Sequence, residues 1–347
     1  MKRILFFLFV VLVTITTSCD KDPVINNSKG KGDKEDLQHK ITMTTQKTDI
    51  TVRIAGSGSI TIDWGDMTEI QTYSIRGFGI MWETVQEIRY KYSNLSTHTI
   101  TISGDNITHL GCFDNGLSYL DISKNNTLIS LNCNMNSLTQ LDVSKNTTLS
   151  SLRCYNNQLT SLDVSALTEL TFLSCQTNKL SSLDLKNNTK LQILDCGPNQ
   201  IRNLDLSNNT ELVVLMCGDN KIVSLDLSKN TKLTDVTCDT NQLTELNVSG
   251  LAQLAYLHCG RWINYSEGPG NLLTQLDVSG CASLSYLDCG YNRLSVEAMN
   301  SLFETLNETT ISTGKDVLIF NNPGTDDCDR KIAENKGWWV TDLLIKN

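Results

Sequence analysis

Hydrophobic residues recur along most of the chain at a fixed interval of 21 residues. Six units of equal length run without a gap over residues 117–242, and two further units begin at Leu243 and Leu273. Within a unit, a leucine and a cysteine two positions apart alternate with other residues, as Leu131 and Cys133 do. This spacing predicts one short β-strand per unit, with the leucine and the cysteine pointing inward.

An asparagine follows each predicted strand, where the chain has to turn away. A buried amide both donates and accepts hydrogen bonds, so it can satisfy backbone groups that a bend leaves unpaired. We therefore expect a structural column of asparagines. Its members are Asn115, Asn136, Asn157, Asn178, Asn199, Asn220, Asn241, Asn271 and Asn292.

Read from its strand onward, each unit follows the pattern LxxLxCxxNxLxxLDVSxNxx. The pattern resembles the leucine-rich-repeat family, with cysteine where the third leucine usually stands. The resemblance covers residues 107–322 and implies a mainly β fold, a right-handed solenoid of about nine coils of 21 residues. Its parallel sheet would line the concave face, and stacking would bury one continuous column of leucines.

Nine of the 12 cysteines also align from unit to unit. Their Cβ atoms would be about 4.8 Å apart in parallel strands, farther than the ~3.8 Å of a disulfide. A column also places its thiols along a line, whereas zinc needs four ligands that converge. We expect inert, buried thiols and no metal; whether Cys281 and Cys328, outside the column, form a pair is open. The column comprises Cys112, Cys133, Cys154, Cys175, Cys196, Cys217, Cys238, Cys259 and Cys289.

The LDVS segments align a column of aspartates, with Asn247 as the exception. Like charges about 5 Å apart in water repel by roughly 0.8 kcal/mol, so the column needs compensation. Hydrogen bonds from turn amides are the first expectation, and a ladder of calcium ions is the alternative. The aspartates are Asp121, Asp142, Asp163, Asp184, Asp205, Asp226 and Asp277.

Residues 37–106 precede the repeats and alternate polar with apolar positions, which predicts a small β-sandwich. Residues 58–66, with Tyr92, resemble the immunoglobulin-like module of the polycystic-kidney-disease type, although Met67 stands where glycine is usual. The resemblance implies a spacer or interaction module, and a cap over the first coil is the alternative. The expected strands cover residues 41–46, 49–56, 58–66 and 98–104.

Residues 107–293 form the predicted solenoid, and residues 294–347 are expected to cap its far end. Apolar residues between Val296 and Leu306 have helical spacing, and residues 317–322 repeat the strand and its asparagine without the cysteine. A polar-faced end unit shields the last layer of a solenoid core. We expect Trp338 and Trp339 to pack within this cap.

The first 18 residues have the pattern of a secretory signal, with Lys2 and Arg3 before a short apolar run. Thr17, Ser18 and Cys19 resemble the lipobox of bacterial lipoproteins, which implies cleavage before Cys19 and a lipid on its sulfur. Residues 19–36 contain almost nothing apolar besides Val24 and Ile25, which predicts a disordered tether. The protein is thus expected on the cell surface, anchored to the outer membrane.

Losing Lys2 and Arg3 with the signal would change the net charge from −9 to about −11, with no strong basic cluster left to bind nucleic acid. The chain has no HExxH, GxSxG or P-loop motif. Only His258, with Asp288 and Asp235 on nearby coils, would make an acid/base group. A hydrolase is thus the weakest hypothesis, and we expect a monomer without a cofactor.

Side chains that point outward from the strands form the expected binding surface. Toward its middle, apolar residues in adjacent coils would form a stripe typical of interaction sites. Toward its carboxyl end, tyrosines stand beside acidic residues. The candidates are Arg153, Tyr155, Phe172, Ile193, Asp195, Val214, Met216, Asp235, Asp239, Tyr256, His258, Tyr286, Asp288 and Tyr291.

One unit has eleven residues between Cys259 and Asn271, where the others have two. This 260–270 insertion carries Arg261, Trp262, Tyr265 and Glu267, and Trp, Tyr and Arg are common hot-spot residues of interfaces. Contact with a ligand and a merely tolerated loop both stay open.

These features predict a surface lipoprotein that binds a protein or a glycan through the concave face and the insertion. Internalin-like surface proteins are similar in repeat type, which implies contact with a host or a neighbouring cell. A structural spacer of the envelope without a ligand is the main alternative.

Overall fold

The computed structural model describes residues 39–75, 85–261, 270–308 and 314–342. All of them belong to one compact unit, Leu37–Asn347. The predicted signal, the lipidated Cys19 and the tether lie outside the described residues. Among the described helices, none has the length and apolar character needed to cross a membrane.

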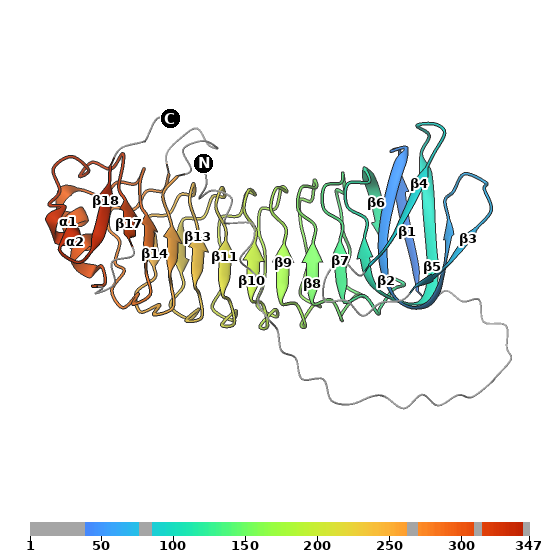
Figure 1. Ribbon diagram of the computed structural model, residues 1–347, viewed down its shortest axis with the longest axis horizontal. Coiled ribbons are helices and arrows are strands. Elements are labelled where there is room, and N and C mark those ends of the chain that lie inside the picture. Colours follow the sequence, from blue (N-terminus) through green and yellow to red (C-terminus); the bar gives the residue numbers. More distant parts are fainter. Residues whose placement is uncertain (1–38, 76–84, 262–269, 309–313, 343–347) are drawn as a thin grey trace, which may run out of the picture. The chain divides into compact units, whose positions relative to one another are not determined.

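Short parallel strands stacked one beside the next form the spine of this unit (Figure 1). Neighbouring strands pair in register, so that each central leucine or valine faces the next, as Leu131 faces Leu152 and Leu194 faces Leu215. These central residues are buried in one continuous hydrophobic core, which confirms the predicted solenoid. The strands are β7 (Ser130–Asn132), β8 (Ser151–Arg153), β9 (Phe172–Ser174), β10 (Ile193–Asp195), β11 (Val214–Met216), β13 (Asp235–Thr237), β15 (Tyr256–His258) and β16 (Tyr286–Asp288).

A second, two-stranded sheet comprises β12 (Ser224–Asp226) and β14 (Glu245–Asn247), which come from the LDVS segments of two coils. In the turns after these segments, each aspartate accepts a hydrogen bond from the amide two residues on. The Ser144 amide donates to Asp142 Oδ1 at 2.9 Å, and Ser207 does the same for Asp205. These bonds hold the pKa of both carboxyls below its usual value, and the expected turn bonds are thus confirmed.

The asparagine column closes every bend, as predicted. Asn157 Nδ2 donates to the carbonyls of Cys133 at 3.0 Å and Cys154 at 3.1 Å, while its Oδ1 accepts from the Leu138 amide at 2.9 Å. A single side chain therefore joins three backbone segments from consecutive coils. The same pattern recurs through the cap, where Asn322 bonds Cys289, Ile319 and Leu294.

A second column of buried asparagines follows the LDVS turns, at the last asparagine of the repeat pattern, to which the sequence had suggested no role. Asn188 Nδ2 donates to the carbonyls of Val164 at 3.0 Å and Leu167 at 2.8 Å. Asn209 and Asn230 repeat the arrangement in the next two coils. The solenoid thus has an amide ladder at two of its corners.

All eleven cysteines of the described residues are free and buried, Cys281 and Cys328 included. Burial raises the pKa of Cys133 to about 12 and that of Cys281 to about 11. A thiol attacks oxidants and disulfides through its thiolate, which this burial suppresses. The column therefore acts as apolar filling of the core.

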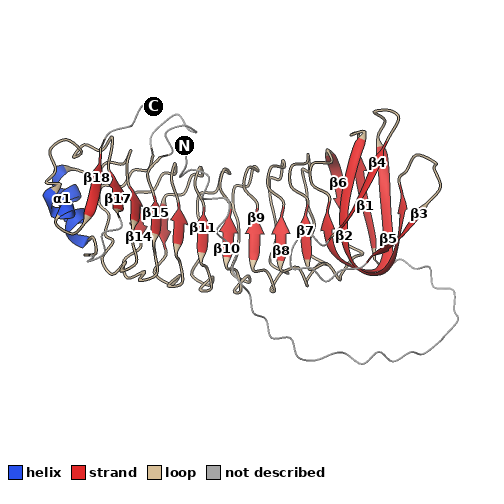
Figure 2. Ribbon diagram, in the orientation of Figure 1, coloured by secondary structure: helices blue, strands red, loops and turns tan. Residues whose placement is uncertain are grey.

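Antiparallel strands cover the amino-terminal end of the solenoid (Figure 2). β5 pairs with β1 and β2 in antiparallel fashion and with β7 in parallel, where His109 faces Ser130. The predicted boundary between residues 106 and 107 thus falls inside one strand. The strands are β1 (Lys40–Thr45), β2 (Asp49–Asp63), β3 (Gln71–Ile75), β4 (Gln86–Lys91), β5 (His98–Gly111) and β6 (Leu117–Asp121).

The asparagine column continues into this end of the molecule. Asn115 Nδ2 donates to the Thr51 carbonyl at 2.8 Å, and the Thr51 amide donates back to Asn115 Oδ1 at 3.0 Å. β2 therefore receives the bonds that a preceding coil would receive. These contacts match the alternative of a cap over the first coil.

Two details of this end differ from the prediction. The segments 49–56 and 58–66 are not separate strands, because β2 runs through both. Gly56 lies inside β2, and a Cβ there would stand 1.9 Å from the Asn106 carbonyl oxygen. The glycine therefore allows β5 to pack closely against β2, and it does not form a turn. The mainly polar β3 and β4 were not predicted at all.

The far end is closed by α1 (Val296–Thr305), β17 (Lys315–Leu318), α2 (Lys331–Glu334) and β18 (Trp338–Thr341). α1 confirms the predicted helix and buries Met299, Leu302 and Phe303. Trp338 is buried and donates from Nε1 to the Asn307 carbonyl, as expected of cap packing. The same expectation is wrong for Trp339, which is 70% exposed because successive residues of β18 point to opposite sides.

We expect Asn157→Ala to lower the free energy of unfolding by about 2 kcal/mol. It leaves the buried Leu138 amide without an acceptor, and it removes one of the two amide donors from each of the Cys133 and Cys154 carbonyls. Urea unfolding followed by circular dichroism measures the loss. Gln158→Ala, at the exposed neighbouring position, should change stability by less than about 0.5 kcal/mol. Equal effects of the two variants would show that the column contributes no stability.

Candidate ligand-binding face

Strand register sorts the outward side chains of the large sheet into rows. The first row precedes the buried central residues and reads Ser130, Ser151, Phe172, Ile193, Val214, Asp235, Tyr256, Tyr286, Asp316 and Trp339. The second row follows the central residues and reads Asn132, Arg153, Ser174, Asp195, Met216, Thr237, His258 and Asp288. We call these two rows together the strand face.

The middle of the strand face is apolar. Phe172, Ile193 and Val214 are half-buried neighbours in the first row, whereas Met216, which is 36% exposed, lies in the second row. The predicted stripe therefore spans two rows. Arg153 places its guanidinium 4.2 Å from the centre of the Phe172 ring, and burial lowers the pKa of this arginine.

Tyr155 lies half-buried two positions beyond Arg153 on the same coil. It follows the cysteine rather than the central leucine, so it stands beside the second row. The amino-terminal part of the candidate surface thus consists of one arginine, one tyrosine and small polar residues.

Aromatic and acidic side chains share the carboxyl-terminal part of the first row. The rings of Tyr256 and Tyr286 stack with their centres 4.5 Å apart and their planes 5° apart. Asp235 precedes this pair, and Asp316 and Trp339 follow it. Asp316 and Trp339 were not among the predicted site residues, although each directly precedes a valine that packs in or against the core, Val317 and Val340.

Beside the tyrosines, the second row carries a buried histidine between two carboxylates. His258 is fully buried, with Nδ1 3.0 Å from Asp288 Oδ2 and Nε2 3.9 Å from Asp239 Oδ2. The expected partner Asp235 lies instead in the first row. The His258 imidazole is therefore not accessible to a substrate, which weakens the hydrolase hypothesis.

Asp239, Tyr256, His258 and Asp288 were expected on the surface, yet all four are less than a tenth exposed. Glycines after the cysteines explain how the carboxylates fit. A Cβ at Gly218 would stand 2.2 Å from Asp239 Oδ1, and one at Gly260 would stand 2.5 Å from Asp288 Oδ1. Each glycine thus leaves room for an acidic side chain of the following coil.

Burial makes the strand face a costly place for negative charge. It raises the pKa of Asp195 and of Asp239 to about 6, and in Asp239 the nearby His258 only partly offsets the effect. No set of three or more His, Cys, Asp and Glu residues that could hold a metal occurs within the described part of the chain.

Arg261, at the start of the insertion, places its guanidinium 4.4 Å from the centre of the Tyr291 ring. The remaining candidates of the insertion, Trp262, Tyr265 and Glu267, lie outside the described residues. The predicted role of the insertion in binding thus stays a prediction.

Comparison with known proteins gives no matching family model and no matching curated protein. Among solved structures, the functional domain of InlJ from Listeria monocytogenes, which includes a cysteine ladder, is similar at 31% identity and a TM-score of 0.50. The match covers 69% of this chain and 56% of that domain. The protein is a leucine-rich-repeat solenoid.

A leucine-rich-repeat protein of Leptospira interrogans shares the fold, with 22% identity and a TM-score of 0.51 over 67% of this chain and 65% of that one. The chain thus spans less than two thirds of either structure. Leucine-rich-repeat solenoids are generally binding domains rather than enzymes, so the outward rows of this solenoid are its candidate site.

Asp195 makes the stability of the solenoid depend on pH. Its pKa rises from 3.8 to about 6 on folding, so the stability that comes with the protonated carboxyl is present below pH 4 and lost as the pH rises through 6. Asp195→Asn stays neutral and keeps an acceptor for the Gly197 amide. We expect it to exceed the wild type by about 2 kcal/mol at pH 7.5 and to match it at pH 4.

Urea unfolding at the two pH values measures this difference. Asp205→Asn is the matched control, because the pKa of this exposed carboxyl is lowered and the variant should lose a little stability at pH 7.5. A gain for Asp195→Asn that is as large at pH 4 would contradict the assignment.

Proposed function

We propose that the protein is a cell-surface lipoprotein that holds a protein or glycan partner on its strand face. The observation that carries the proposal is the first row, which presents Phe172, Ile193 and Val214 as half-buried neighbours. After Asp235, the same row continues with Tyr286, which is half-buried and stacks on the buried Tyr256. Contiguous apolar and aromatic side chains at a surface mark interaction sites. The row would correspond to the predicted concave face.

The amino-terminal sequence supports a location on the outer membrane. A signal-like segment, the lipobox-like Thr17-Ser18-Cys19 and a polar stretch over residues 19–36 would anchor the solenoid and hold it away from the lipid. The antiparallel strands before the first coil, which in sequence resemble a module of the polycystic-kidney-disease type, would serve as a cap and spacer. Likeness to internalin-like proteins favours a partner on a host or a neighbouring cell.

Binding is tested by screening the purified protein on protein and glycan arrays and then comparing two matched variants. Val214→Arg places a long cation in the apolar middle of the strand face and should lower affinity for the captured partner at least about tenfold. Val223→Arg places the same side chain at a 45% exposed position outside the strand face, just before β12, and should bind normally. A partner that tolerates Val214→Arg would bind elsewhere, and no partner at all would favour the spacer.

Anchoring is tested separately in cells. Cys19→Ser removes the sulfur that would carry the lipid, so we expect loss of palmitate incorporation and release from the membrane fraction. Cys328→Ser, in the carboxyl-terminal cap, should leave both unchanged. Labelling that persists in Cys19→Ser would contradict the lipoprotein assignment.

A further inference from the structure

Acidic side chains outnumber basic ones on and beside the strand face from β10 onward. In each of these coils we consider the segment from the first-row residue to the residue of the asparagine column. Within the described residues, these segments contain one lysine or arginine, Arg261, whose guanidinium lies over the Tyr291 ring. Lys315 is buried and donates to Asn307 Oδ1 at 2.7 Å inside the cap. The carboxylates of the same region are Asp195, Asp219, Asp235, Asp239, Asp288 and Asp316.

Two of these acids bracket the stacked tyrosines. Asp235, Tyr256, Tyr286 and Asp316 are consecutive members of the first row. Neighbouring strands lie about 4.8 Å apart, so three steps separate the two carboxylates by about 14 Å. The tyrosine pair occupies the space between them.

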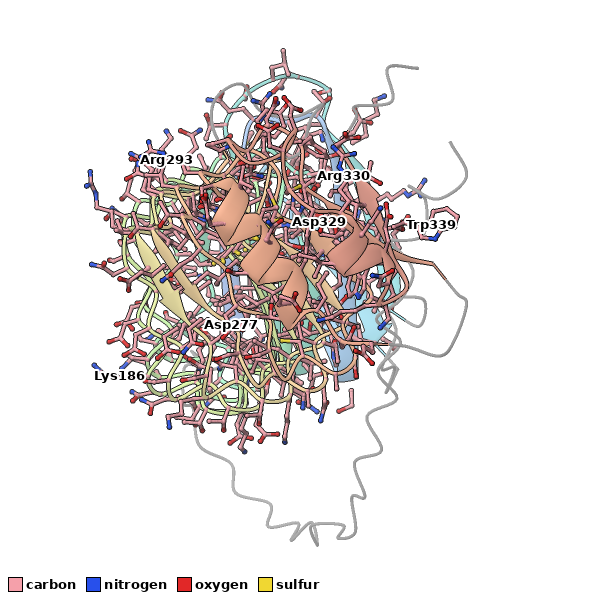
Figure 3. All side chains as sticks on the ribbon, turned by 90° about the vertical axis from the view of Figure 1, so that its left-hand side faces the viewer. Lys186, Asp277, Arg293, Asp329, Arg330 and Trp339 are labelled. Atoms are coloured by element: carbon pink, nitrogen blue, oxygen red, sulfur yellow. The ribbon has the colours of Figure 1, made fainter. Side chains whose placement is uncertain are left out.

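Trp339 extends the row by one more step. It pairs with Asp316 in register and is 70% exposed, so Asp316 lies between the positions of Tyr286 and Trp339. Figure 3 shows Trp339 at the outer margin of the molecule, on the side opposite Lys186. The row thus ends on an exposed indole next to the position of the Asp316 carboxylate.

Aromatic rings beside carboxylates match the chemistry of lysine and arginine. The ammonium or guanidinium group pairs with the carboxylate and is attracted to ring faces, while its methylene stem packs on apolar surface. A neutral glycan would stack on the rings but gain nothing from the excess of negative charge.

An extended peptide fits the spacing of the two acids. It rises about 3.4 Å per residue and turns alternate side chains to the same side, so residues four apart are about 14 Å apart and face one way. We propose that this part of the strand face binds an extended basic segment of a partner protein, with cations four residues apart at Asp235 and Asp316. The inference rests on the proposed function and names the chemistry of its partner.

Synthetic peptides test the spacing directly. The probe is a fluorescein-labelled ten-residue peptide of serine and threonine with lysines at the third and seventh positions; its control has the two lysines adjacent. Anisotropy titrations with the purified protein at 50 and 300 mM NaCl measure affinity. We expect the spaced peptide to bind about fivefold more tightly than the adjacent one, and less tightly at high salt.

Three variants locate the binding site. Asp235→Asn and Asp316→Asn remove charge with little change of shape, and each should weaken binding of the spaced peptide about fivefold. Glu245→Gln, on β14 in the second sheet, removes an exposed charge elsewhere and should have no effect. Equal affinity for the two peptides, or full affinity in Asp316→Asn, would overturn the inference.

The partner captured on the arrays separates this inference from the proposed function. If Val214→Arg abolishes capture while Asp316→Asn and 300 mM NaCl leave it unchanged, the strand face binds a partner of other chemistry. The proposed function then stands and the basic segment is refuted. A captured protein that loses affinity in Asp316→Asn and at high salt supports both.

Discussion

The hydrogen bonds made by the side-chain amides of the asparagine column are the interaction on which the rest of the structure depends. Each coil must bend sharply after its strand, and a bend exposes carbonyls and amides that no strand partner can reach. Asn157 and its equivalents satisfy those groups from two coils at once. Because the bond pattern joins coil to coil, it also sets the register in which the strands pair.

Register then determines what the surface can be. Since neighbouring strands pair in register, residues 21 positions apart lie side by side. The residues at one position of the repeat therefore form a row on the surface of the molecule. The first row passes from serines through an apolar middle to tyrosines and acids. Small changes of composition from coil to coil thus create a graded face on a uniform core.

The period made most of this architecture predictable. Leucine, cysteine and asparagine recur at fixed spacing, and each has one physical reason for its place, so the solenoid, the asparagine column and the turns at the aspartates followed from sequence. Gly56 shows where this reasoning stops, because its role depends on Asn106, fifty residues later. A local pattern assigns such a glycine to a turn.

The candidate site was less predictable for a related reason. Outward direction follows from alternation, but burial depends on neighbours in other coils, so the small Gly218 and Gly260 decide that Asp239 and Asp288 are covered. Trp339 was assigned to the cap by its position near the carboxyl end rather than by the alternation of β18. Its register with Asp316 emerges only when irregular coils are aligned in space.

Because no disulfide cross-links one coil to another within the described residues, the array has a modular length. Duplicating or deleting one unit would preserve the type of contact between neighbouring coils in the core. It would move all later residues by one strand spacing, about 4.8 Å. Distances between surface groups in such a molecule change in whole steps, never continuously. Evolution can therefore adjust its reach toward a partner by counting repeats, while side-chain chemistry at each step varies independently.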